Sequence, residues 1–184
     1  VKLIEADPWE RPQESRKTGN QKIDLIFAGR SSEEKIRLLQ EKLNADEAFL
    51  FTNLEEVSYL FNMRDFSKPY AANILGKAFV SKNTACLYIP ENMPELDEVL
   101  KNFKGRIFVD KSSVNARDFA LINDRAQVAA SPLKQMKSIK TEAEINHYKE
   151  AFKRTDAAMF AIREYIENND NISEYDIAEQ LEKE

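Results

Sequence analysis

The sequence is poor in the residues that build several common functional sites. It contains one cysteine, Cys86, which has no partner for an internal disulfide, so a disulfide-stapled secreted domain is excluded. None of its four glycines stands in a GxGxxG or GxxxxGK arrangement. A loop that cradles phosphate groups in a nucleotide site is therefore not expected.

Long apolar runs and clusters of one charge are also missing. No apolar segment approaches the roughly 20 residues that span a bilayer, and the N-terminus does not resemble a signal peptide. The net charge is −5, with acids and bases interleaved, whereas binding to nucleic acid requires clustered Lys and Arg. The sequence predicts a soluble cytoplasmic protein without a membrane or nucleic-acid partner.

Candidate catalytic groups are isolated from one another. His147, the single histidine, has no second His or Cys nearby to complete a metal site, so a surface role is predicted. Cys86 lies in an apolar strand pattern and is expected to be a buried structural thiol. The acids at 33–34, 55–56 and 182–184 are interpreted as helix-capping or solubilising groups on exposed faces. These 184 residues predict no catalytic residue and no metal ligand.

Helical and strand patterns alternate between residues 21 and 130. Helices are predicted at 31–45, 53–62, 93–104 and 112–123, and strands at 46–52, 71–81, 83–90, 106–110 and 126–130. Ser31 and Glu34 have the spacing of a capping box at the start of the first helix. The turn at 82–83 joins two strands as an antiparallel pair. The pattern predicts an α/β fold with a mixed β-sheet flanked by helices.

The two ends of the sequence have a different character. Residues 1–20 are rich in proline and charge and predict an extended linker, with Trp9 pinned to a neighbouring surface. Residues 141–168 predict one long helix that opens with a capping box at Thr141 and Glu144. Its apolar stripe consists of Ile145, Tyr148, Phe152, Met159, Ile162 and Ile166. A second helix starts at Ser173 and is still open at Glu184, so the chain is interpreted as a piece of a longer protein whose second domain is truncated.

Four motifs in order carry a family resemblance. "DPWERP" is similar to a "W-x-(D/E)-R-P" connector, and "FAGRSSEEKIRLLQEKL" to a "G-x-S-x-x-(E/D)-K" domain opening. "NLEEVSYLFNMRDFSKPY" is similar to an "L-D-E-(I/V)-x-W-L-x-N-x-R-G" segment, and "MKSIKTEAEI" to a "K-(S/N)-x-x-E" domain start. In this order and spacing the chain resembles the three-domain Xaa-Pro aminopeptidases (aminopeptidase P) of the creatinase/prolidase superfamily.

The resemblance implies a domain organisation and a function. Residues 1–20 would be the linker from a missing first domain, 21–130 the creatinase-like middle domain, and 131–184 the start of a truncated pita-bread catalytic domain. The full-length enzyme would be a metalloaminopeptidase that uses two divalent metal ions, expected to be manganese, on peptides with proline in second position. A homodimer is also expected. The alternative is a catalytically inactive pita-bread-family protein that binds peptides or proteins.

The resemblance singles out two residues in the stretch "FNMRDF". Asn62 and Arg64 match the family's Asn and Arg and are the candidate substrate-binding residues, at a helix-to-strand turn that faces the catalytic cleft. Two roles remain open for Arg64: a structural one that satisfies nearby carbonyls or carboxylates, which is favoured, and direct contact with substrate. Asp65 departs from the family pattern, in which glycine is usual.

Overall fold

Helices and strands alternate along most of the chain in the computed structural model, which describes residues 19–67 and 71–183. In chain order the α/β part contains β1 (Asn20–Lys22), α1 (Leu25–Ala28), α2 (Ser32–Gln40), β2 (Glu47–Phe51), α3 (Leu54–Phe61), β3 (Met63–Asp65), β4 (Lys77–Ser81), β5 (Ala85–Tyr88), α4 (Met93–Asn102), β6 (Arg106–Val109), α5 (Ala116–Ile122) and β7 (Ala126–Val128). The helices α6 (Pro132–Ser138), α7 (Glu142–Asn168) and α8 (Glu174–Leu181) follow. Trp9 and the "DPWERP" motif lie outside the described residues.

The main sheet has the strand order β5-β4-β2-β6-β7. β2 pairs antiparallel with β4 and parallel with β6, and β4 pairs antiparallel with β5. The predicted mixed sheet and its hairpin are thereby confirmed. Cys86 lies in β5 at the edge of this sheet and is only partly buried, so the prediction of a buried thiol is wrong in degree.

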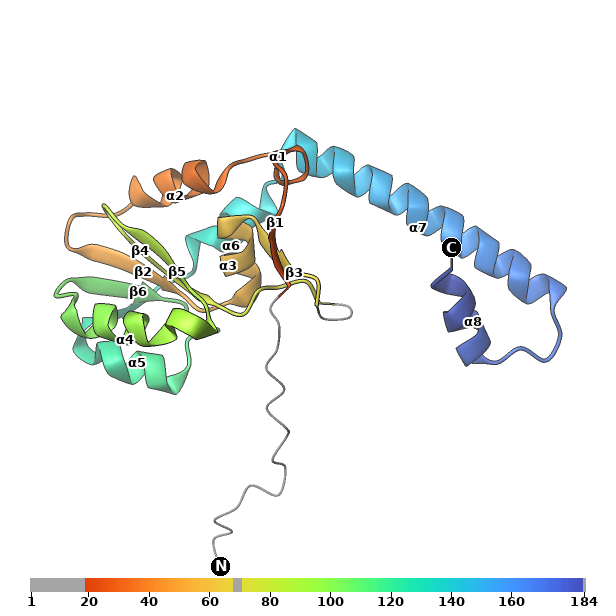
Figure 1. The fold of residues 1–184 in the computed structure, drawn as a ribbon. Coiled ribbons are helices and arrows are strands. Elements are labelled where there is room, and N and C mark those ends of the chain that lie inside the picture. The colour runs from red at the N-terminus through yellow and green to blue at the C-terminus, as the bar shows by residue number, and fades with distance from the viewer. Residues whose placement is uncertain (1–18, 68–70, 184) are drawn as a thin grey trace, which may run out of the picture.

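Helices cover both faces of this sheet (Figure 1). One apolar cluster joins α2, α3 and α6 to the sheet, and the other joins α4 and α5 to the opposite face. Side chains alternate along β2, with Phe51 in the first cluster and Ala48 and Leu50 in the second. A strand covered on both faces reads as a continuous apolar run, which explains the segment "AFLF".

A second, two-stranded sheet lies beside the first, and the sequence did not reveal it. β1 pairs antiparallel with β3, with Gln21 opposite Arg64. The "FNMRDF" stretch is therefore more than a turn, and Asn20 belongs to a strand where a linker was predicted up to residue 20. α1 and α6 were also not predicted, and the four residues of α1 are too few to show periodicity.

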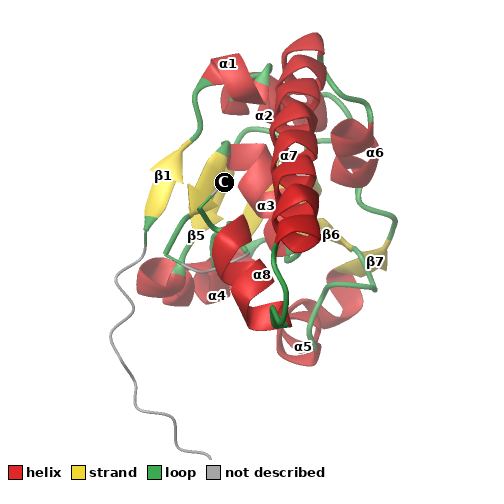
Figure 2. Cartoon of the chain, turned by 90° about the vertical axis from the view of Figure 1, so that its right-hand side faces the viewer, coloured by secondary structure: helices red, strands yellow, loops and turns green. Residues whose placement is uncertain are grey.

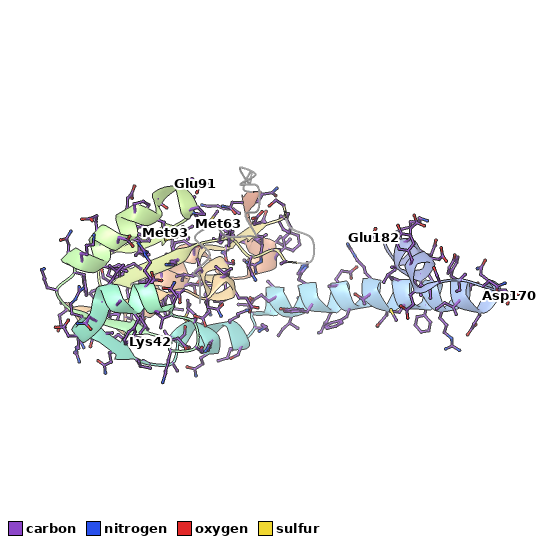
Figure 3. The ribbon with its side chains drawn as sticks, turned by 90° about the horizontal axis from the view of Figure 1, so that it is seen from below. Lys42, Met63, Glu91, Met93, Asp170 and Glu182 are labelled. Carbon is purple, nitrogen blue, oxygen red and sulfur yellow. The ribbon has the colours of Figure 1, made fainter. Side chains whose placement is uncertain are left out.

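The long helix α7 projects away from the α/β part, and α8 folds back beside its far end (Figures 1 and 3). In Figure 3, Asp170 marks this far end, and Glu182 marks the end of α8, further back along α7. The predicted capping box is present, since the Thr141 hydroxyl accepts from the Glu144 N–H and the Glu144 carboxylate accepts from the Thr141 N–H. Among the described residues, no helix combines the length and apolar character needed to cross a membrane.

Most of the apolar stripe of α7 is exposed in this chain. Phe152 is 65% exposed and Phe160, beside the stripe, is 71% exposed, whereas Ile162 is buried. The helix also carries exposed ion pairs such as Arg163 with Glu167. Exposed apolar surface of this kind marks a region that another surface covers.

We expect the 184-residue chain to associate through this stripe. Replacing Phe152 and Phe160 together with aspartate should weaken association at least about tenfold, because burying a carboxylate in an apolar contact is unfavourable. Sedimentation velocity over a concentration series would measure this, with Lys153→Ala as an exposed control on the same helix. A strictly monomeric wild-type chain whose α7 amides are fully protected from hydrogen exchange would contradict the expectation.

Candidate functional site

A cavity of about 290 Å³ lies where the small sheet meets the start of α7. α1 and the N-terminal end of α7 lie side by side above β1 and β3 in Figure 1, and Figure 2 shows the same region from the side of α7. The cavity brings together the end of α3, the strand β3 and the first turns of α7. Its walls are formed by Ile23, Phe27, Ala28, Lys35, Tyr59, Asn62, Arg64, Phe66, Ala72, Glu144, His147 and Tyr148.

The "G-x-S-x-x-(E/D)-K" motif builds one side of this cavity. Gly29 ends α1 in the left-handed region, at φ 66°, and a Cβ there would lie 2.0 Å from the Thr141 hydroxyl oxygen. Only glycine allows this combination of backbone angle and close approach. Ser31 caps α2 by accepting from the Glu34 N–H at 3.1 Å. The motif thus closes α1, opens α2 and seats the first turn of α7.

Lys35, the last residue of that motif, is a buried charged group at the base of the cavity. Its side chain is 1% exposed, and its ammonium donates to the Tyr59 carbonyl at 2.7 Å and to Asn62 Oδ1 at 2.5 Å. The ammonium also lies 3.7 Å from the centre of the Tyr59 ring. Burial lowers the pKa of Lys35 to about 8, against the opposing attraction of Glu144.

Asn62 joins Lys35 to the end of α3. It terminates the helix in the left-handed conformation, at φ 51°, which asparagine tolerates better than other residues with a Cβ. Its amide nitrogen donates to the Arg30 carbonyl at 2.9 Å while its oxygen accepts from Lys35. The side chain is buried, and both ends of its amide form hydrogen bonds to other groups of the protein. The structure therefore gives Asn62 a positioning role, and substrate binding by Asn62 stays a prediction.

Arg64 lies two residues further on, in β3. Its guanidinium is half-buried, lines the cavity and donates to the Met63 carbonyl at 2.8 Å. Burial lowers the pKa of the Arg64 guanidinium below its ordinary value, and the neighbouring Tyr148 and Glu55 offset only part of this shift. The structure therefore places Arg64 at the cavity wall with a carbonyl partner, which fits both roles predicted for it.

The hydrogen bonds of Asp65 give a structural reason for an aspartate at a position where the family usually has glycine. The carboxylate is buried, and its Oδ1 accepts from the Gly19 N–H, the Ser67 N–H and the Ser67 hydroxyl at 3.1, 3.0 and 2.6 Å. These bonds tie the start of β1 to the segment after β3. A glycine at this position could not make them.

The first two turns of α7 form the opposite wall of the cavity. His147 is exposed and its ring meets the Phe27 ring edge to face, with centres 4.9 Å apart. Glu144 also faces the cavity, although its Oε2 already accepts from the Thr141 N–H and hydroxyl at 2.8 and 3.0 Å. The predicted surface position of His147 is confirmed, while its place at the cavity mouth could not be inferred from sequence.

A second polar cluster fixes the start of α6 and corrects one interpretation. Glu56 was assigned to an exposed face, but it is 4% exposed and accepts from the Ser131 hydroxyl at 2.6 Å. Burial raises the pKa of Glu56. Asp110 accepts a hydrogen bond from Lys134 at 2.6 Å. The bonds that it accepts from Lys134 and Ser112 hold the pKa of its carboxyl group below the usual range. The cluster joins the sheet to the residues that lead into α7.

The cavity does not contain a metal site. Within residues 19–67 and 71–183, no group of three or more His, Cys, Asp or Glu side chains is arranged to hold a metal ion. Lys35 and Arg64 at the cavity would also repel a cation. This part of the chain therefore does not fit the pair of metal ions that the family resemblance implies.

Comparison with known proteins places this architecture in a class. The fold is a creatinase-like α/β domain, and the creatinase/prolidase N-terminal domain family matches residues 10–105. The chain therefore belongs to the creatinase/prolidase family of N-terminal domains.

Individual relatives point in the same direction. A probable Xaa-Pro aminopeptidase P of Aspergillus clavatus is 28% identical over 85% of this chain and 30% of its own length. An uncharacterized peptidase of Schizosaccharomyces pombe is 29% identical over 87% of this chain and 31% of its own. The X-prolyl aminopeptidase from Caenorhabditis elegans, described as a cytosolic enzyme with a di-nuclear active site, superposes with a TM-score of 0.82 at 18% identity, over 90% of this chain and 32% of that one. The resemblance to Xaa-Pro aminopeptidases is thereby confirmed, and the chain spans about a third of the length of these relatives.

Proposed function

We propose that this chain is part of a metal-dependent Xaa-Pro aminopeptidase that removes the N-terminal residue from peptides with proline in second position. The observation that carries the proposal is the match to relatives named Xaa-Pro aminopeptidase over most of this chain. In this proposal a linker precedes β1, the middle domain runs from β1 to residue 130, and residues 131–184 are the start of the pita-bread catalytic domain. The segment supports the cleft without catalysing the reaction.

The metal ions are assigned to another part of the protein. The Caenorhabditis elegans enzyme is described with a di-nuclear active site, and we propose two divalent ions, manganese by preference, for the full-length protein. The described residues offer no cluster for them, so no catalytic step is assigned to this segment. Its contribution is the cavity wall that carries Arg64 and the seat that Gly29 gives to α7.

Two further properties belong to the same proposal. A cytoplasmic location agrees with the description of the Caenorhabditis elegans enzyme as cytosolic. Assembly into a homodimer agrees with the exposed apolar side chains of α7, such as Phe152 and Phe160. Cross-linking and light scattering of the full-length protein would test the assembly.

Peptidase activity should belong to the full-length protein and not to the 184-residue chain. With added Mn²⁺, the full-length protein should release the first residue of an Xaa-Pro-Xaa tripeptide, and the 184-residue chain should give no turnover above a blank purification. The reason is that two-metal hydrolysis requires convergent ligands, which the described residues lack.

The controls separate the two candidate functions. An Xaa-Ala-Xaa tripeptide should be cleaved far more slowly by the full-length protein than the proline peptide. Metal-dependent turnover by the purified 184-residue chain would contradict the assignment of the metals to another part. A full-length protein that binds the proline peptide without cleaving it would instead favour the catalytically inactive binding protein.

A further inference from the structure

The cavity at the start of α7 carries an excess of positive charge. Lys35 and Arg64 both line it, and the charge of Arg64 lowers the pKa of Lys35 further. Arg30 lies nearby but is paired with Glu34 at 3.2 Å. Among the lining residues that the structure describes, Glu144 is the one carboxylate, and its Oε2 already accepts two hydrogen bonds from Thr141. A bound anion would offset the mutual repulsion of these cations.

Most of the N–H donors of Arg64 at this wall form no hydrogen bond within the part of the chain that the structure describes. An arginine side chain carries five N–H donors, and across the described ranges the one hydrogen bond of its guanidinium runs from Nη1 to the Met63 carbonyl. The group is half-buried and so partly removed from water. A planar guanidinium in this state matches a carboxylate, which can accept two parallel hydrogen bonds from it.

Lys35 acts on Arg64 indirectly, through Asn62 at the end of α3. Its ammonium holds Asn62 at 2.5 Å, and Asn62 sets the left-handed turn from which β3 and Arg64 start. Because Lys35 is 1% exposed, it contributes a fixed charge beneath the cavity and not a flexible surface arm. The backbone from which Arg64 projects is therefore anchored by buried bonds, and its guanidinium is oriented by the bond to the Met63 carbonyl.

The remaining walls select for an apolar group next to the anion. The rings of Phe27 and Phe66 line the cavity and are 47% and 58% exposed. Ile23 and Ala72 add aliphatic surface. The volume of about 290 Å³ is at the lower limit of ligand sites, which suits one or two amino-acid residues.

We propose that this cavity binds the C-terminal carboxylate of a short peptide whose last residue is apolar, with Arg64 as the carboxylate fork and Phe27 and Phe66 against the side chain. This deepens the proposed function, on which it rests for the choice of a peptide as ligand. A free amino acid is disfavoured, because its ammonium would lie two bonds from the carboxylate carbon and face Lys35 and Arg64. A C-terminal residue in a peptide has a neutral amide there instead.

The single histidine provides a direct test. The imidazole signals of His147 in the 184-residue chain can be followed by NMR while N-acetyl-prolyl-phenylalanine is added, because His147 lines the cavity and has no other histidine to overlap it. We expect a saturable shift. The C-terminal amide of the same peptide, and L-phenylalanine as the free amino acid, should each bind at least about tenfold more weakly.

Substitutions assign the effect to the fork. Arg64→Ala should weaken binding at least about tenfold, and Arg64→Lys, which keeps the charge without the planar fork, should also weaken it measurably. Lys101→Met, in an exposed position on α4, should bind as the wild type does. Equal urea midpoints for the Arg64 variants and the wild type would show that the loss concerns binding and not folding.

Three outcomes would overturn the inference: equal binding of acid and amide, wild-type binding by Arg64→Ala, or no saturation up to ~10 mM peptide. Tight binding of L-phenylalanine would also overturn it, since the ligand would then be a free amino acid. The acetylated peptide has no free amino terminus and is no substrate for an aminopeptidase. Failure of this test would thus leave turnover by the full-length protein untouched, and loss of that turnover would leave peptide binding untouched.

Discussion

The variant Asn62→Ala is expected to lower the free energy of unfolding by about 3 kcal/mol. Removal of the amide leaves the buried Lys35 ammonium and the Arg30 carbonyl each short of a partner, which costs roughly 1–3 kcal/mol. Alanine at φ 51° adds about 1 kcal/mol, because its Cβ crowds the backbone in the left-handed region. Urea denaturation followed by circular dichroism would measure the loss.

Two matched variants separate these causes. Asn62→Gly removes the amide but accepts the backbone angle, so it should cost about 1 kcal/mol less than Asn62→Ala. Asn171→Ala places alanine at a similar φ of 58° in an exposed turn, and should cost about 1 kcal/mol or less. If Asn62→Ala costs no more than Asn171→Ala, the buried amide bonds contribute nothing to stability.

The second large effect is a rise in stability with pH, by about 2 kcal/mol between pH 8 and pH 10. Lys35 has a pKa of about 8 in the folded chain and the ordinary 10.5 when unfolded. In this window the unfolded state binds more protons than the folded state, so the free energy of unfolding increases with pH. Above pH 10 the trend should reverse, since burial raises the pKa values of Tyr59 and Tyr88 and unfolding then releases protons more readily.

Lys35→Met provides the decisive comparison for this effect. The methionine chain fills a similar volume without a titrating group, so this variant should show no rise between pH 8 and pH 10. Lys101→Met, on the exposed surface of α4, should retain the rise of the wild type. A wild-type stability that is flat or falls across this window would contradict the burial of a charged Lys35.

The sequence predicted the main sheet well because each of its strands carries its own local pattern. β2 is a continuous apolar run, and β4 and β5 are joined by a short polar turn that dictates an antiparallel pair. Helix starts were equally accessible, since Ser31 and Thr141 cap their helices through neighbours three residues away. These features depend only on residues a few positions apart, so a short segment of sequence is enough to predict them.

Only part of the candidate site could be predicted from the sequence, because its geometry depends on contacts between residues that are far apart in the chain. Asn62 and Arg64 were singled out by a family motif, but β1 and β3 are three residues each and pair across more than 40 positions of the chain. Lys35 was missed because a lysine in an amphipathic helix is ordinarily exposed, and its burial depends on the end of α3 lying beside α2. The position of His147 depends in turn on Gly29, which lets α7 approach α1.

The seat of α7 against Gly29 has a mechanical consequence. A helix of 27 residues is about 40 Å long at a rise of 1.5 Å per residue. Such a rod is held at its first turn, where Thr141 lies against Gly29, and projects from there (Figure 1). By simple leverage, a tilt of about 5° at that turn would move the far end by about 3–4 Å over this length. A substitution beside Gly29 that tilted α7 by this amount would therefore displace α8, which lies beside the far end, by about the diameter of an atom.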